Sequence, residues 1–166
     1  EIKTKVLKLN NNKLSELNIN VQNNVIEELH LHYNKFVFFP LIEKNILGNL
    51  KILYLSNNFI VNVPEEINEL KCLEELNLRN NYIEKIDLNI PSLRILDVTY
   101  NKIVYINVYF LINLQILKAD NNAISTVNGI SNKHVRVLTL SYNKMSSFPN
   151  LSYMNGEISS RLFSIT

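Results

Sequence analysis

Two histidines and a nearby carboxylate are the first side chains of this sequence whose spacing could support chemistry. His30 and His32 stand two residues apart, so on a β-strand they would share a face, with Glu28 in the same row. Imidazole and carboxylate groups placed in this way can ligate a metal ion. No cysteine or further histidine lies near them in the sequence. We therefore expect adventitious metal binding or none at this place, and no cofactor.

Two aspartates could be taken for a catalytic pair. Asp97 and Asp120 fall at neighbouring places of a repeated pattern, but Arg79 and Lys118 flank them. We expect both carboxylates to be open to water and charge-paired, which is not the environment of an acid–base pair. The single cysteine, Cys72, is expected to be a small buried hydrophobe.

Motifs of common enzyme classes are absent from the sequence. The chain has three glycines and no glycine-rich phosphate loop, and it contains no GxSxG, HExxH or CxxC motif. We therefore predict that the protein is not an enzyme.

The composition bounds the class of protein. The 166 residues are 46% hydrophobic and 19% charged, which is ordinary for one soluble domain covering residues 1–166. A net charge of +2 is too mild to indicate a nucleic acid or an anionic membrane as partner. No apolar run approaches the roughly 20 residues of a membrane helix. One cysteine allows no internal disulfide, so we expect an intracellular, cytoplasmic protein. We also expect it to be monomeric by itself.

An asparagine recurs at a fixed place in a repeated apolar pattern. In the copy around Asn58, the apolar residues Leu53, Leu55, Ile60 and Val63 lie five and three residues before it and two and five after it. Successive copies are 22, 24, 23, 20, 21 and 21 residues apart. The seven asparagines, which we name the ladder, are Asn12, Asn34, Asn58, Asn81, Asn101, Asn122 and Asn143.

This repeat has a direct physical interpretation. The LxL pair alternates like a short strand with one buried face, and the chain returns about 20 residues later to lay a parallel strand beside it. One coil cannot enclose its own leucines, so stacked coils make the core. The turn after each strand leaves buried backbone groups without partners, which costs about 1–3 kcal/mol per group. An inward asparagine can donate and accept hydrogen bonds there, and the residue preceding it is expected to be exposed.

The pattern LxLxxNx(L/I/F)xx(L/I/V/F), from Val6 to Phe148, resembles the leucine-rich-repeat family of the intracellular type, with mixed repeats of 20–24 residues. The copy Leu50–Leu70 carries the resemblance best, and its VPEEINEL connector looks like that of the 23-residue subclass. The resemblance implies an α/β solenoid: a horseshoe with a concave parallel β-sheet and short irregular or 3-10 connectors on the convex side. Residues 149–166 would form a partial eighth repeat or a C-terminal cap.

One connector is unusually apolar. In NVYFLINL, residues 107–114, we expect Tyr109, Phe110 and Leu111 to fill the convex side of the core. An exposed apolar patch at the same place is the alternative.

The strand residues between and beside the buried leucines should face the concave surface. Seven strands about 4.8 Å apart make a face roughly 30 Å across, enough for a standard interface of about 800 Å² per partner. Tyr54 and Arg79, near its centre, are side chains typical of interface hot spots. The alternative is that these are merely solvated strand residues. The predicted partner-binding residues are Glu28, His30, His32, Tyr54, Glu75, Asn77, Arg79, Asp97, Thr99, Lys118 and Asp120.

The resulting functional hypothesis is a non-catalytic module that binds a protein partner on its concave face. One alternative, implied by the resemblance, is a regulatory subunit of a signalling enzyme in a phosphatase or GTPase pathway. Another is the repeat portion of a larger multidomain protein whose catalytic domain is absent, because the chain begins with Glu1 and not with methionine. Tyr33, Tyr100 and Tyr142 with nearby lysines could stack nucleic-acid bases, but the near-neutral charge argues against that partner.

Overall fold

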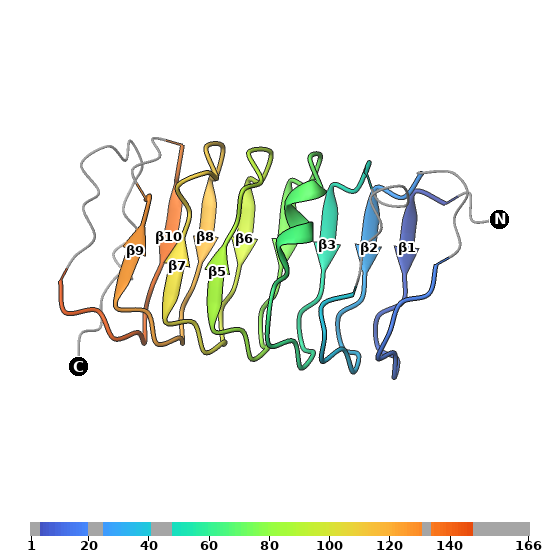
Figure 1. Ribbon diagram of the computed structural model, residues 1–166, viewed down its shortest axis with the longest axis horizontal. Coiled ribbons are helices and arrows are strands. Elements are labelled where there is room, and N and C mark those ends of the chain that lie inside the picture. Colours follow the sequence, from blue (N-terminus) through green and yellow to red (C-terminus); the bar gives the residue numbers. More distant parts are fainter. Residues whose placement is uncertain (1–3, 20–24, 41–47, 131–133, 148–166) are drawn as a thin grey trace.

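The chain winds into coils stacked along one axis (Figure 1). This computed structural model describes residues 4–19, 25–40, 48–130 and 134–147. Each coil adds one short strand to a continuous sheet, and later coils lie progressively farther from the N-terminus along the axis. The predicted partial repeat at 149–166 lies outside the described residues.

The main sheet has seven parallel strands of three residues each, paired in exact repeat register. Leu29 is paired with Leu53, and Leu53 with Leu76, so equivalent apolar residues lie side by side. In every main-sheet strand after the first, the middle residue is buried, which leaves the first and third for the other face. The predicted parallel solenoid is thus confirmed. The strands are β1 (Val6–Lys8), β2 (Glu28–His30), β3 (Ile52–Tyr54), β4 (Glu75–Asn77), β6 (Ile95–Asp97), β8 (Ile116–Lys118) and β10 (Val137–Thr139).

A second parallel sheet lies on the convex side, where we expected only irregular or 3-10 connectors. It consists of β5 (Lys85–Asp87), β7 (Tyr105–Asn107) and β9 (Thr126–Asn128). Its central residues Ile86, Ile106 and Val127 belong to the apolar column five residues after each ladder asparagine. The repeats of 20 and 21 residues leave too little chain for a helix, so these connectors run extended and pair with one another.

The longer coil before β5 has the only described helix, the 3-10 helix η1 (Glu65–Glu69). Pro64 precedes it with φ −75°, and Glu65 and Glu66 place negative charge in the first turn. Ile67 is its buried residue and packs into the convex side of the core.

Two expectations about convex side chains were wrong. Tyr109 and Phe110 are 64% and 47% exposed, whereas Leu111 is buried together with Val108 and Leu114. The Leu111 and Leu114 N–H groups donate to the carbonyls of the residues three positions earlier, as in a 3-10 turn. Every third side chain therefore points into the core, and the side chains between them point to solvent.

Cys72 is also exposed, not buried as we expected. The Leu73 N–H donates to the Leu70 carbonyl, and both leucines are buried. Cys72 lies between these two inward positions and therefore faces solvent.

Each described coil bends sharply at the residue before its ladder asparagine. All seven of these residues have φ between 54° and 58°, the left-handed region that non-glycine residues seldom occupy. Four are asparagines, which tolerate this conformation best, and three are tyrosines. They are Asn11, Tyr33, Asn57, Asn80, Tyr100, Asn121 and Tyr142.

Candidate functional site

The solvent-facing side of the seven-stranded sheet, which we name the concave face, brings the predicted partner-binding residues into rows. Strand register places His30 beside Tyr54, Tyr54 beside Asn77, Asn77 beside Asp97, and Asp97 beside Lys118. Glu28 and Glu75 share the first row with apolar strand residues. The others, His32, Arg79, Thr99 and Asp120, lie two residues beyond the ends of their strands.

Aromatic rings gather at β2 and β3. The His30 and Tyr54 rings meet edge to face with centroids 4.8 Å apart, and the His32 ring lies 6.0 Å from His30 and 6.3 Å from Tyr54. Burial and the neighbouring His30 lower the pKa of His32, which favours its neutral form. His30 Nε2 lies 3.4 Å from a Glu28 carboxylate oxygen. No three His, Cys, Asp or Glu side chains within the described ranges gather closely enough to hold a metal ion.

Tyr54 is held in one orientation by the next strand. Its phenol donates a hydrogen bond of 2.9 Å to the Glu75 carboxylate. Burial, with this carboxylate beside it, raises the pKa of Tyr54 to about 12. At neutral pH the phenol is therefore a fixed donor, and Glu75 retains further acceptor capacity toward solvent.

Arg79 is exposed and lies over an aromatic ring of the next coil. Its guanidinium carbon is 4.8 Å from the centroid of the Tyr100 ring, within the range of a cation–π contact. The Arg79 backbone N–H donates to Asn77 Oδ1 at 3.0 Å, which fixes the chain at the end of β4.

The two aspartates are not the open, charge-paired groups that we expected. Asp97 is only 9% exposed and accepts a 3.0 Å hydrogen bond from the Thr99 N–H; Thr99 itself is 4% exposed. Asp120 accepts from the Ser141 N–H and from the Thr139 hydroxyl. Their oxygens satisfy turn and strand-end donors, as short polar side chains often do, so Asp97 and Thr99 offer little surface to a partner.

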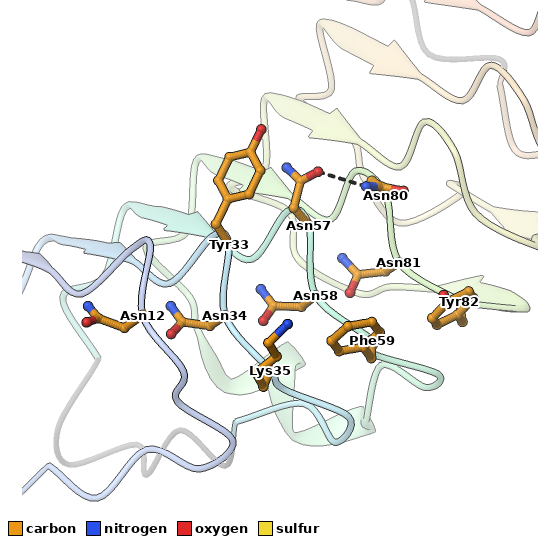
Figure 2. A pocket seen from close by; sticks show the side chains of 10 residues that line it. All are labelled: Asn12, Tyr33, Asn34, Lys35, Asn57, Asn58, Phe59, Asn80, Asn81 and Tyr82. Carbon is orange, nitrogen blue, oxygen red and sulfur yellow. Dashed lines mark hydrogen bonds between the residues drawn. The ribbon is translucent and has the colours of Figure 1, made fainter.

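The ladder asparagines lie in a row just beyond the strands (Figure 2). Asn81 Nδ2 donates at 3.0 Å to the Leu78 carbonyl of its own coil and to the Leu55 carbonyl of the preceding one, while its Oδ1 accepts from the Ile60 N–H at 2.9 Å. The other five ladder residues from Asn34 to Asn143 have the same three kinds of bond. Asn12, in the first coil, is exposed, and its bonds to other described residues stay within its own coil.

A row of stacked side chains beside the ladder was not predicted from the sequence. Lys35 Nζ lies 5.1 Å from the Phe59 ring centroid, the Phe59 and Tyr82 rings stack with centroids 6.1 Å apart, and Lys102 Nζ lies 4.8 Å from the Tyr82 centroid. Each of these residues directly follows a ladder asparagine, and this shared position in the repeat is the sequence feature from which the row could have been predicted. We name them the edge row: Lys35, Phe59, Tyr82 and Lys102.

Comparison with known proteins agrees with this geometry. A family model described as Leucine Rich repeats (2 copies) matches residues 48–90, the stretch that holds β3, η1, β4 and β5. Residues 48–90 are leucine-rich repeats, and the chain has the leucine-rich-repeat fold. No curated protein sequence gives a significant match.

Solved leucine-rich-repeat structures superpose on this leucine-rich-repeat chain. The functional domain of InlJ from Listeria monocytogenes, which includes a cysteine ladder, has a TM-score of 0.74 and 25% identity over 87% of this chain. A leucine-rich-repeat protein of Leptospira interrogans has a TM-score of 0.67 and 29% identity over 81%. The ectodomain of the Arabidopsis thaliana receptor kinase GASSHO1/SCHENGEN3, in complex with CASPARIAN STRIP INTEGRITY FACTOR 2, has a TM-score of 0.62 and 25% identity over 72%.

The chain is shorter than these relatives. It spans 31%, 37% and 16%, respectively, of the three solved chains. No helix among the described residues is long and apolar enough to cross a membrane.

Proposed function

We propose that this leucine-rich-repeat chain is a non-catalytic module that binds another protein on its concave face, with β2, β3 and β4 at the centre of the contact. The observation that carries the proposal is the arrangement of Tyr54 and Arg79. Each is a side-chain type common at interface hot spots, and each is held in place by a neighbouring coil, through Glu75 and Tyr100. Side chains that are already ordered lose less conformational entropy on binding.

Charge and hydrogen-bonding capacity indicate the chemistry of the partner surface. Glu28 and Glu75 accept hydrogen bonds, and Arg79 is a cation. The rings of His30, His32 and Tyr54 form an aromatic cluster beside these groups. A partner surface with a basic or donor group facing Glu75, and a carboxylate facing Arg79, would complement this face.

Partner capture tests the proposal. Tagged wild-type protein would be compared with Tyr54→Ala and Arg79→Glu, and with Lys71→Glu as a charge-matched control on the convex connector, where Lys71 is exposed. We expect both concave-face variants to melt near the wild-type temperature and to lose a partner that the Lys71→Glu protein retains. Capture of the same partner by all four proteins would refute the concave-face assignment.

The same proposal extends to domain organisation and location. One continuous buried cluster runs from Ile26 to Leu140, which supports a single repeat domain. An exposed free thiol at Cys72 is compatible with a reducing, intracellular compartment, whereas one of the solved relatives is an ectodomain. Cell fractionation of the full-length protein distinguishes these locations.

A further inference from the structure

A groove of about 340 Å³ runs along the edge of the solenoid, outside the concave face. Figure 2 shows its three rows: ladder asparagines form the middle, Tyr33, Asn57 and Asn80 lie on one side, and Lys35, Phe59 and Tyr82 on the other. The ladder amides are engaged with backbone groups, so the outer rows supply what a ligand would meet.

Three edge-row residues, Lys35, Phe59 and Tyr82, line this groove, and Lys102 lies beyond its end, over the Tyr82 ring. Coil order places Phe59 between Lys35 and Tyr82, and Tyr82 between Phe59 and Lys102, so neighbours cover both faces of each ring. The rings nevertheless remain 37% and 43% exposed. What they offer is the electropositive edge of the aromatic quadrupole, which suits acceptors and apolar groups and does not allow a planar base to stack.

Charge at the edge favours an anionic ligand. The residues that directly follow the ladder asparagines include Lys13, Lys35, Lys102 and Lys144 and no acidic residue. Among the described residues, neither Lys35 nor Lys102 forms an ion pair, in contrast to Lys5 and Lys51, which both pair with Glu27. Both edge-row lysines are exposed.

The spacing of these lysines matches an extended peptide. Lys35 and Lys102 are three coils apart, about 14 Å at the usual strand separation. Four residues of an extended chain span about 13 Å, and side chains at i, i+2 and i+4 share one face. Carboxylates at i and i+4 would therefore meet the two lysines while the side chain at i+2 contacts the edges of Phe59 and Tyr82.

We propose that the edge row and its groove bind an extended acidic peptide segment of the form Glu-x-Φ-x-Glu, where Φ is apolar. On the other side of the groove, Asn80 Nδ2 donates to Asn57 Oδ1 at 2.7 Å, and the remaining Asn57 amide donors and Asn80 carbonyl oxygen can bond the peptide backbone. This site is separate from the concave face and can be tested independently of the proposed function.

Fluorescence anisotropy with labelled synthetic peptides tests this proposal. The probe carries Glu-Thr-Leu-Thr-Glu in a neutral background. One control peptide carries Gln at both acidic positions, and the other moves the second Glu from i+4 to i+3, on the opposite face of the extended chain, while Leu stays at i+2. We expect the probe to bind, both control peptides to bind more weakly, and the affinity to fall as salt is added. No binding, or equal binding of all three peptides, would overturn the proposal.

Paired charge variants locate the site. We expect Lys35→Glu/Lys102→Glu to weaken probe binding by about tenfold or more, because two attractive contacts become repulsive, and Lys35→Gln/Lys102→Gln to weaken it by a smaller factor. Lys71→Glu/Lys85→Glu makes the same change in net charge at exposed residues outside the groove and the concave face, and it should bind as the wild type does. Equal loss in this control would mean a nonspecific charge effect and would overturn the proposal, as would tighter binding of single-stranded oligouridine than of the peptide.

Discussion

The phenol of Tyr54 on β3 donates its hydrogen to the Glu75 carboxylate on β4, across the centre of the main sheet, at 2.9 Å. This contact connects two neighbouring coils on the concave face. It explains why a large aromatic side chain at the proposed binding surface has one defined position. Because the Glu75 carboxylate helps to raise the pKa of Tyr54, a measurement of that pKa shows whether this contact is present in solution.

We predict that Tyr54 stays protonated about two pH units above an ordinary tyrosine, with a pKa of about 12 raised from 10.0. Spectrophotometric titration of wild type and Tyr54→Phe should differ only in tyrosinate that forms above about pH 11. Glu75→Gln removes the repelling charge and should lower this pKa. Because the pKa is raised in the folded state, the contribution to stability is fully present below pH 10 and is lost as pH rises toward 12. A difference spectrum already complete at pH 10 would contradict this arrangement.

The ladder asparagines give a prediction about the free energy of unfolding. In Asn81→Leu, the Leu55 and Leu78 carbonyls and the Ile60 N–H lose their side-chain partner inside the stack, and we expect a loss of at least about 3 kcal/mol in the free energy of unfolding. Asn12→Leu is the matched control, because Asn12 is exposed and its bonds to other described residues stay within its own coil; there we expect a loss below about 1 kcal/mol. Chemical denaturation measures both. Equal losses, or a gain at Asn81, would show that the ladder bonds do not stabilise the stack.

How much of this molecule the sequence predicts depends on how each feature is encoded. Apolar columns repeat, so the places of β2, β3 and β4 follow directly from Leu29, Leu53 and Leu76. The convex sheet could not be predicted, because a three-residue strand such as β5 has the same apolar spacing as an irregular connector. The exposure of Tyr109 and the burial of Asp97 depend on the direction in which the local turn points each side chain. Hydrogen bonds to the backbone, such as the one from the Thr99 N–H to Asp97, set that direction, and the sequence pattern does not reveal them.

The bend before each ladder residue gives a prediction about backbone conformation. Asn121 has φ 55°, a conformation that is costly for β-branched residues and free for glycine. We expect Asn121→Val to lose about 1–2 kcal/mol of stability and Asn121→Gly to remain close to wild type. Thermal unfolding of both variants tests this. If valine were tolerated as well as glycine, the left-handed bend would not be required there.

The ion-paired cluster around Glu27 gives a prediction about stability at low pH. Glu27 lies between Lys5 and Lys51, with Nζ–carboxylate distances of 2.6 and 2.8 Å, and hydrogen bonds to these ammonium groups lower the pKa of Glu27 from 4.5 to about 2. Because the pKa is lowered in the folded state, the stabilisation is present above pH 4.5 and is lost as pH falls toward 2. NMR titration of the Glu27 carboxyl should show this value in the wild type and one near 4.5 in Lys5→Ala/Lys51→Ala. The same pKa in both proteins would mean that the lysines do not hold the carboxylate in solution.

The most direct test of the proposed binding face is hydroxyl-radical footprinting of the protein with and without a captured partner. The concave-face account predicts that oxidation of Tyr54, His30 and His32 falls when the partner is bound, while oxidation of the convex Tyr109 and Phe110 is unchanged. Protection of Tyr109 and Phe110, with Tyr54 and the histidines still fully reactive, would contradict it.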